Sequence, residues 1–149
     1  IIRFADVLLM AAEVEVELGN LEKARAYVNQ LRARASNPDG FVKRSDGSNA
    51  ANYHVGLFET LWADAGQARR AVRFERKLEL SGEGHRFFDL VRWGIAAQSL
   101  NQYLSYESGP LPIAFGGAFF TENKNEHYPI PDAQIKLQGP EVLKQNPGY

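Results

Sequence analysis

The chain has 149 residues, of which 44% are hydrophobic and 23% are charged. This is the composition of an ordinary globular domain, which buries ~68–70% of its extended surface at this length, and it excludes disorder as the main state. Seventeen Lys and Arg residues against 18 Asp and Glu residues give a net charge of −1, which excludes the basic footprint of a nucleic-acid binder. The absence of cysteine excludes disulfides, thiolate metal ligands and cysteine nucleophiles.

The sequence contains no run of about 18 apolar residues, as a membrane-spanning helix would need, and it does not open on a signal-peptide pattern. It begins with Ile1 instead of Met and is already in a helical pattern there. We therefore expect the chain to be a segment of a longer polypeptide whose targeting signal lies outside it.

Residues 1–35 are predicted to form a helical hairpin. Apolar residues recur at spacings of three and four between residues 2 and 18, which predicts one buried stripe, with Asp6 and three glutamates elsewhere on the helix surface. The stripe consists of Phe4, Val7, Leu8, Ala11, Val14 and Leu18. The inner face of a second helix, over 21–35, consists of Leu21, Ala24, Val28, Leu31 and Ala35. Because Gly19 and Asn20 form so short a link, the two helices must be antiparallel, as in a tetratricopeptide repeat.

Residues 36–57 are predicted to form an exposed loop, because they contain two clusters of turn-forming residues, at 36–40 and 46–49. Helical periodicity returns over 58–103, with a break allowed at Gly66 and a glycine-rich interruption at 81–84. The last helix of this region, from about 85 to 103, is apolar around most of its circumference, which predicts burial on two sides.

Residues 104–149 are predicted to form an irregular loop and an extended, proline-rich C-terminal tail. The regular elements expected there are a short strand near 118–121 and a short helix at 132–137, and the prolines force extended backbone before them. A segment this irregular stays ordered only by docking on the helices. The fold class that follows is mainly α, with tetratricopeptide-like hairpins and long irregular loops in one domain over 1–149.

The densest group of polar residues lies between residues 69 and 92. Glu75 and Glu79 are one helical turn apart, so they could serve as a carboxylate pair for acid–base chemistry or as metal ligands. The surplus of nearby arginines favours a structural interpretation, in which both glutamates accept hydrogen bonds from Arg86 and Arg92 of the next helix. We predict that five residues of this group hold the fold together: Glu75, Glu79, Arg86, Asp89 and Arg92.

Residue spacings typical of catalysis are absent from the sequence. There is no His-Glu-x-x-His motif, no Gly-x-Ser-x-Gly elbow and no phosphate-binding loop. Gly82 and Gly84 open a dinucleotide-like glycine pattern, but Phe87 stands at its third glycine. The sequence therefore predicts no catalytic residue, no metal site and no cofactor.

Six aromatic residues gather around a stretch rich in Gly, Pro and Asn: Tyr103, Tyr106, Phe115, Phe119, Phe120 and Tyr128. Such rings either pin an irregular loop onto helices or offer a stacking surface to the apolar faces of sugars. For the phenylalanines, we favour the interpretation that the rings pin the loop onto the helices. If this chain contacts a ligand, we expect the contacts within 103–128 and Tyr106 among them.

Three ordered blocks, which together span essentially the whole chain, resemble the C-terminal region of the SusD/RagB family. The first is Arg3-Phe4-Ala5-Asp6-Val7-Leu8-Leu9-Met10 with Ala12-Glu13, followed by Ala24, Asn29, Arg32 and Arg34-Ala35. The central block is Glu75-Arg76, Glu79-Leu80, Glu83-Gly84-His85-Arg86-Phe87-Phe88-Asp89-Leu90 and Arg92-Trp93-Gly94. The terminal block is Tyr128-Pro129-Ile130-Pro131 and Gln145-Asn146-Pro147-Gly148-Tyr149. Gln134 departs from the pattern, since the family often has an acid there.

The resemblance implies a nutrient-binding lipoprotein of Bacteroidetes-type bacteria, anchored by lipid on the outward face of the outer membrane. Such proteins cap a TonB-dependent, SusC-like transporter and capture oligosaccharides for import without catalysing a reaction. The signature blocks are architectural, so the resemblance assigns no binding residue. The residues alone leave two other functions open, namely a helical-repeat module that binds protein partners and a glycosidase that uses two carboxylates.

Overall fold

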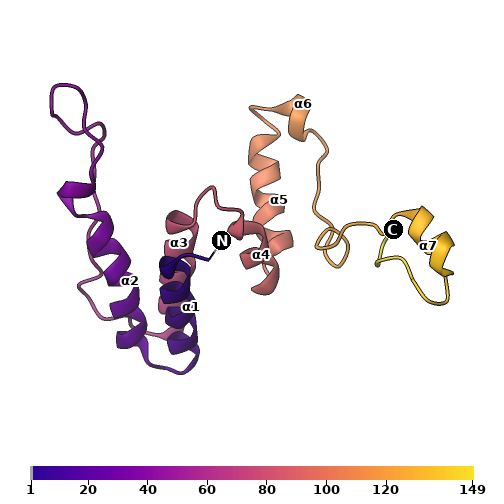
Figure 1. Cartoon of the computed structure of the whole chain (residues 1–149), viewed down its shortest axis with the longest axis horizontal. Coiled ribbons are helices and arrows are strands. Elements are labelled where there is room, and N and C mark those ends of the chain that lie inside the picture. The colour runs from indigo at the N-terminus through magenta and orange to yellow at the C-terminus, as the bar shows by residue number, and fades with distance from the viewer. Residues whose placement is uncertain (1) are drawn as a thin grey trace. The chain divides into compact units, whose positions relative to one another are not determined.

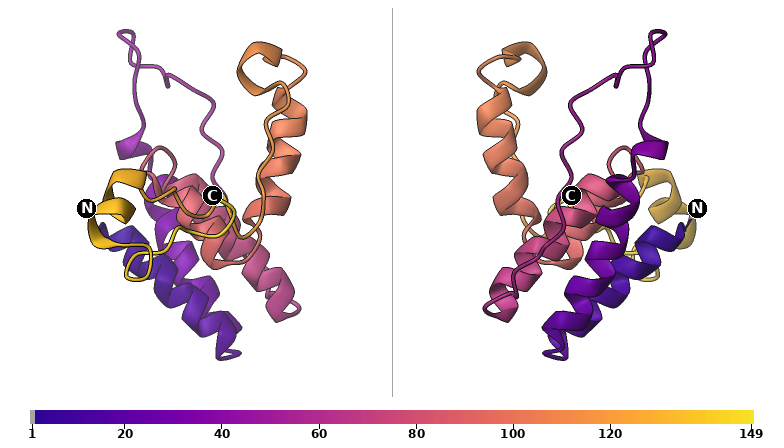
Figure 2. Two further views of the ribbon diagram at one scale, coloured as in Figure 1. Left: turned by 90° about the vertical axis from the view of Figure 1, so that its right-hand side faces the viewer. Right: turned by 90° about the vertical axis from the view of Figure 1, so that its left-hand side faces the viewer.

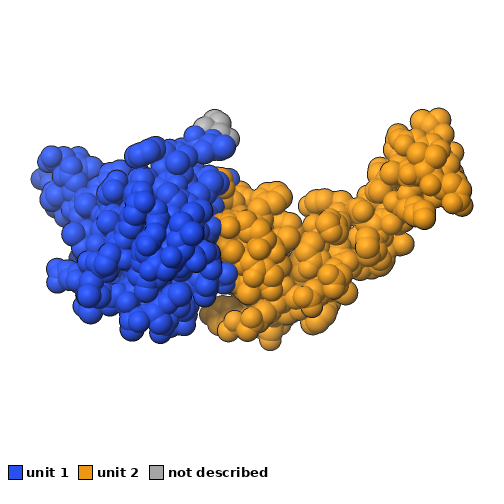
Figure 3. Space-filling view, turned by 90° about the horizontal axis from the view of Figure 1, so that it is seen from below, with its two compact units in different colours: residues 1–83 blue, residues 84–149 orange. Residues whose placement is uncertain are grey.

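The computed structural model describes residues 2–149, which form seven α-helices and no β-strand, so the predicted mainly helical fold with long irregular loops is confirmed (Figure 1). The helices are α1 (Phe4–Glu17), α2 (Leu21–Ala35), α3 (Ala65–Glu79), α4 (His85–Arg92), α5 (Ala96–Glu107), α6 (Pro112–Phe115) and α7 (Asp132–Gln138), with a 3-10 turn η1 at Pro38–Gly40. The chain consists of two compact units, a first unit that ends at Glu83 and a second unit that begins at Gly84 (Figure 3). The single domain predicted over 1–149 stays a prediction.

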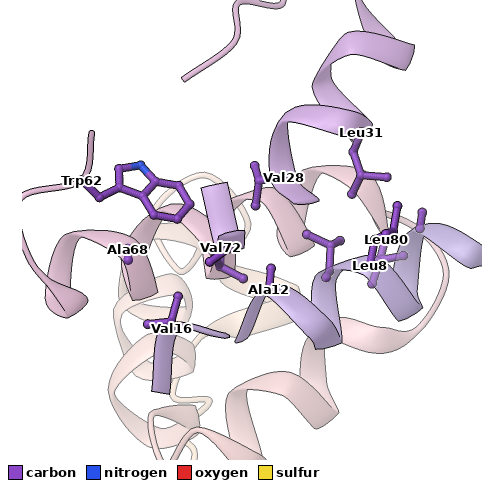
Figure 4. Close-up of a cluster of buried hydrophobic side chains, with 12 residues drawn as sticks. Leu8, Ala12, Val16, Val28, Leu31, Trp62, Ala68, Val72 and Leu80 are labelled. Carbon is purple, nitrogen blue, oxygen red and sulfur yellow. The ribbon is translucent and has the colours of Figure 1, made fainter. Parts of the chain in front are cut away.

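The first unit is a bundle of three helices, in which α1 and α2 form an antiparallel hairpin and α3 packs against both (Figure 2). Gly19 ends α1 in the left-handed region, with φ 80°, which a residue with a Cβ rarely adopts. Alanines at 12, 24 and 68 are fully buried and let the helices approach one another closely. The core consists of Ala5, Leu8, Leu9, Ala12, Val16, Ala24, Val28, Leu31, Trp62, Ala68, Val72 and Leu80 (Figure 4).

The buried face of α1 differs from the predicted stripe. Leu8 is buried as predicted, but four other members are exposed: Phe4 72%, Val7 47%, Val14 57% and Leu18 67%. The core instead takes the face that carries Leu9 and Val16. The prediction was wrong because α1 is apolar on two faces, and spacing alone does not say which face the other helices cover. On α2 the predicted face is confirmed for Ala24, Val28 and Leu31, whereas Leu21 is only partly buried and Ala35, in the last turn, is exposed.

The helix predicted from residue 58 begins only at Ala65. Asp64 caps it by accepting a hydrogen bond from the Gln67 backbone N–H at 2.7 Å. The preceding residues are held in place by α2, since the Asn29 side chain exchanges hydrogen bonds of 2.9 and 3.1 Å with the Phe58 backbone. Trp62 then fills the core next to Phe58. The apolar spacing of this segment reflects docking on α2 and not helix formation.

In the second unit, the helix predicted over 85–103 is divided into α4 and α5. The break is at Gly94, which has φ 67° and donates to the Val91 carbonyl at 2.9 Å, while Ile95 donates to the Leu90 carbonyl at 3.0 Å. This pattern closes α4 in the way glycine commonly closes helices. The short helix predicted at 132–137 is confirmed as α7.

The strand predicted near 118–121 does not form. The side chain of Asn101 takes the place of a neighbouring strand, because its amide oxygen accepts from the Phe120 N–H at 2.7 Å and its amide nitrogen donates to the Phe120 carbonyl at 2.9 Å. Phe120 is thereby fixed in the core of this unit with Leu90 and Ala96.

No helix within residues 2–149 is long and apolar enough to cross a lipid bilayer.

The two faces of α1 can be distinguished by matched Leu→Ala changes. Leu9→Ala should lower the free energy of unfolding by about 2–5 kcal/mol, because Leu9 is fully buried and its removal leaves a cavity. Leu18→Ala should change it by less than about 0.5 kcal/mol, because Leu18 is exposed. Urea unfolding of this chain measures both, and a larger loss for Leu18→Ala would mean that the predicted stripe faces the core.

Candidate functional site

Glu75 and Glu79, the pair of carboxylates singled out in the sequence, accept hydrogen bonds from arginines within the first unit. Arg32 Nη1 donates to Glu75 Oε2 at 2.7 Å, and Arg34 Nη2 donates to both carboxylate oxygens of Glu79 at 2.7 Å. Their side chains are almost fully buried. These arginines come from α2, which packs beside α3. The predicted hydrogen bonds from Arg86 and Arg92, which belong to the second unit, stay a prediction.

Arg3 extends this network just before α1 begins. Its Nη1 donates to Glu79 Oε1 at 3.0 Å and its Nη2 to the Glu79 backbone carbonyl at 2.8 Å. Its Nε and Nη2 also donate to the two carboxylate oxygens of Glu83, at 2.9 and 2.7 Å. Hydrogen bonds to Glu83 and Glu79 raise the pKa of the Arg3 guanidinium above its ordinary value. The start of α1 is therefore fixed to the end of α3 by charge-assisted hydrogen bonds.

The most deeply buried ion pair was missed by the sequence analysis, which placed Asp6 on the helix surface. Arg76 Nη1 of α3 donates to Asp6 Oδ1 of α1 at 2.8 Å, and the two side chains are 2% and 1% exposed. The second apolar face of α1 could have indicated that Asp6 is buried. Leu9, three residues after Asp6, lies on that buried face.

Asp89, Arg86 and Arg92, the other residues predicted to be structural, lie in the second unit around Trp93. Asp89 is buried, and its Oδ1 accepts a hydrogen bond from Arg92 Nε at 2.9 Å and forms an ion pair with Arg92 Nη2 at 2.9 Å. The guanidinium groups of Arg92 and Arg86 lie 4.9 and 5.8 Å from the centre of the Trp93 ring, within range of cation–π attraction. The contribution of these residues to stability stays a prediction.

A hollow of about 370 Å³ in the second unit is lined mainly by aromatic side chains. Helices α4 and α5 each provide one residue, the loop after α6 provides most of the others, and the last residue completes it. The lining residues are Phe87, Leu104, Ala118, Phe119, Phe120, Asn125, His127, Tyr128 and Tyr149. Phe119 and Tyr128 are 71% and 88% exposed, so their rings are open to a ligand.

Phe120 is the buried residue of this lining. It packs edge-to-face on Phe87, with ring centres 6.3 Å apart. Its backbone is held on both sides by Asn101. The expectation that phenylalanines pin the loop is therefore confirmed for Phe120, whereas Phe119, the residue before it, is exposed.

One side of the hollow, its wall, is formed where the C-terminal block binds the backbone of residues 127–130. Gln145 exchanges two hydrogen bonds with the Ile130 backbone, at 2.7 and 2.9 Å. Asn146 Nδ2 donates to the Tyr128 carbonyl at 2.6 Å, and the Tyr149 hydroxyl donates to the His127 carbonyl at 3.0 Å. Three side chains from the end of the chain thus take over the backbone hydrogen bonding of a segment whose prolines prevent helix formation.

Gly148 lets Lys124 cover the outside of this wall. The Lys124 Nζ lies 4.8 Å from the centre of the Tyr149 ring, and a Cβ added at Gly148 would come within 2.9 Å of the Lys124 side chain. Gly148 also has φ 83°, which favours glycine. The terminal Asn-Pro-Gly-Tyr run is therefore built to place Tyr149 at the hollow.

The hollow is suited to an uncharged ligand with both apolar and polar surfaces. None of its lining side chains is a carboxylate, an ammonium or a guanidinium group. Asn125 Oδ1 accepts from the Thr121 N–H at 2.6 Å, which orients the amide and leaves its nitrogen as a donor. Exposed rings beside an amide donor and the His127 imidazole match the faces and hydroxyls of a sugar.

Tyr106 lies elsewhere, on the exposed surface of α5, and is not among the residues that line the hollow. Its role as a ligand contact stays a prediction. The sequence analysis placed ligand contacts within 103–128, where most of the lining residues lie, but it missed Tyr149 and Asn125. Tyr149 is held beside the loop by hydrogen bonds from residues 146 and 149 to the backbone at 127 and 128. The spacing of residues along the sequence does not reveal these contacts.

The first unit also contains a hollow, but its charged side chains are already satisfied. This hollow of about 650 Å³ is bordered by Trp62, and its amide and charged side chains already have partners, because Asn20 and Lys23 bind Glu15 and Glu22 accepts from Arg25. Lys23 and Asn20 also lower the pKa of Glu15 below its ordinary value, so this carboxylate is already satisfied. Among residues 2–149, no three His, Asp or Glu side chains are arranged so that they could hold a metal ion.

The hairpin bundle of the first unit and the aromatic hollow of the second define a mainly helical protein of tetratricopeptide-like construction. The profile described as the SusD family matches residues 1–149, and the chain belongs to this family. It is 35% identical over its whole length to SusD-like protein P25 of Formosa agariphila, and 30% identical over 99% of its length to SusD-like protein P2 of the same organism. These alignments cover 24% and 25% of the two relatives, so the chain spans about a quarter of their length.

The partners of Glu79 can be checked by alanine substitution. Glu79→Ala should lower the free energy of unfolding by about 1–3 kcal/mol, because it removes charge-assisted hydrogen bonds while Arg3 and Arg34 can be rehydrated. Arg86→Ala should cost only about 0.5–1 kcal/mol, the value of a partly exposed cation–π contact. Thermal and urea unfolding give both values, and a greater loss for Arg86→Ala would contradict the observed pairing.

Proposed function

We propose that this chain is part of a non-catalytic nutrient-binding protein that captures oligosaccharides at the cell surface. The observation that carries the proposal is the uncharged hollow, with the open rings of Phe119 and Tyr128 beside the Asn125 amide. Aromatic rings stack on the apolar faces of sugars while amides bind their hydroxyls. Membership of the SusD family supports the same function.

The setting of the whole protein is part of the proposal. The family resemblance supports an outward-facing position at the outer membrane, a lipid anchor in the full-length protein and a TonB-dependent, SusC-like transporter as partner. Captured oligosaccharides would then pass to the transporter. Because the chain spans about a quarter of its relatives, further ligand contacts from the longer protein are compatible with this function.

Binding without turnover is favoured over glycoside hydrolysis by the state of the carboxylates. A glycosidase needs two carboxyl groups facing one sugar. Glu75 and Glu79 are instead engaged by arginines, and no Asp or Glu side chain lines the hollow. We therefore expect no release of reducing ends from any oligosaccharide that binds.

Sugar affinity should depend on the open rings of the hollow. Tyr128→Ala should weaken binding of an oligosaccharide by roughly two- to tenfold, since aromatic stacking contributes ~0.5–1.5 kcal/mol beyond burial. The ligand is first found by screening a panel of neutral oligosaccharides, and isothermal titration calorimetry then measures the affinities. Tyr106→Ala, measured in parallel, tests the other exposed tyrosine predicted to contact ligand.

The matched control is Phe74→Ala, which removes an exposed ring from α3 in the first unit and should leave affinity unchanged. Equal affinities for the Tyr128→Ala and unsubstituted proteins, with both folded, would contradict the hollow as the site. A panel in which no oligosaccharide binds, or in which a bound one is hydrolysed, would contradict the proposed function.

A further inference from the structure

The hollow of the first unit, called here the hairpin hollow, lies where α2 begins and where the chain approaches α3. Its volume is about 650 Å³. Its lining combines the first turn of α2 with apolar side chains and consists of Gly19, Asn20, Leu21, Glu22, Lys23, Leu61 and Trp62. It belongs to a different unit from the aromatic hollow, and the proposed binding of sugars does not use it.

The first backbone N–H groups of α2 are not capped by a side chain. Asn20 stands at the N-cap but makes no capping hydrogen bond, and its Nδ2 instead donates to Glu15 Oε2 at 2.8 Å. Within residues 2–149, the N–H groups of Leu21 and Glu22 have no acceptor. Uncapped N–H groups at the start of a long helix carry partial positive charge and favour negatively charged acceptors.

Trp62 supplies another donor to the same lining, and this donor does not depend on α2. The residue is only 6% exposed, and its indole Nε1–H is buried with no hydrogen-bond partner among residues 2–149. Figure 4 shows the indole nitrogen on the side of the ring that faces away from Ala68. Since water does not reach this N–H either, it stays unpaired until an acceptor enters, and an unpaired buried donor is costly.

We propose that the hairpin hollow binds a small organic carboxylate. The carboxylate oxygens would accept from the Trp62 indole N–H and from the first N–H groups of α2. A carboxylate suits such a group of donors because its two oxygens accept several hydrogen bonds, which its charge strengthens. Leu21 and Leu61, the latter 63% exposed, provide apolar surface for the rest of the molecule.

The charges at the hairpin hollow favour a ligand with a single negative charge. The Lys23 ammonium is already paired with Glu15, and Glu22 accepts from Arg25 Nη2 at 2.7 Å. The lining side chains therefore add no net charge, and the attraction comes from the uncapped start of α2. The Glu22 carboxylate repels a doubly charged phosphate about twice as strongly as a carboxylate.

NMR spectroscopy of the ¹⁵N-labelled chain tests this proposal, because the chain contains only two tryptophans. Hexanoate is the probe, and hexan-1-ol is its uncharged control. Hexanoate should shift the Trp62 indole signal and the backbone signals of Leu21 and Glu22 together, with one dissociation constant. The indole signal of Trp93, in the second unit, should stay in place. Hexan-1-ol should bind at least about tenfold more weakly, because it cannot supply a charged acceptor.

Two variants change the affinity in opposite directions. Trp62→Phe keeps an aromatic ring but removes the donor, and it should weaken hexanoate binding by about tenfold or more. Glu22→Gln removes a negative charge beside the site, and it should strengthen binding by about two- to fivefold. The Glu22 side chain is 58% exposed, so Glu22→Gln keeps the proposal testable if Trp62→Phe fails to fold.

Three results would overturn the proposal. The first is a Trp62 indole signal that does not shift saturably with hexanoate while the chain stays folded. The second is an equal affinity for hexan-1-ol, which would make the hairpin hollow a purely apolar pocket. The third is an affinity for hexanoate that Glu22→Gln leaves unchanged or lowers.

Discussion

The buried ion pair between Asp6 and Arg76 fixes how α1 packs in the first unit. Removing one partner of such a pair leaves an uncompensated buried charge, at a cost of ~3–5 kcal/mol, so the pair strongly disfavours any rotation of α1 that separates them. α1 has two apolar faces, and the pair selects the one with Leu9 and Val16 for the core. The exposure of Phe4, Val7 and Val14 on the opposite face follows from this choice.

The two units use side chains for different purposes. In the first, the charged residues join helices, since Arg32 and Arg34 of α2 bind Glu75 and Glu79 of α3. In the second, amide side chains replace backbone partners for an irregular segment, as Asn101 does for Phe120 and Gln145 for Ile130. Amides are suited to this because each carries both a donor and an acceptor. A loop held in this way keeps its aromatic rings in place without a strand or helix.

Local features of the sequence predicted local structure well. The helical hairpin, the buried positions of α2 and the short helix α7 follow from periodicity and turn residues near one another in the chain. The start of α3 and the buried face of α1 do not, because Asn29 and Arg76 decide them from distant positions. The same limit applies to the site, where the aromatic loop was identified but its closure by Tyr149 depends on hydrogen bonds between separate blocks.

A double-mutant cycle on Asp6 and Arg76, followed by urea unfolding, tests this account most directly. Asp6→Ala and Arg76→Ala should each lower the free energy of unfolding by about 3–5 kcal/mol, since each leaves the other charge buried. The loss of unfolding free energy in the double variant should be smaller than the sum of the two single losses by at least about 1–2 kcal/mol. Single losses below about 1 kcal/mol, or losses that simply add, would mean that this pair does not determine the packing of α1.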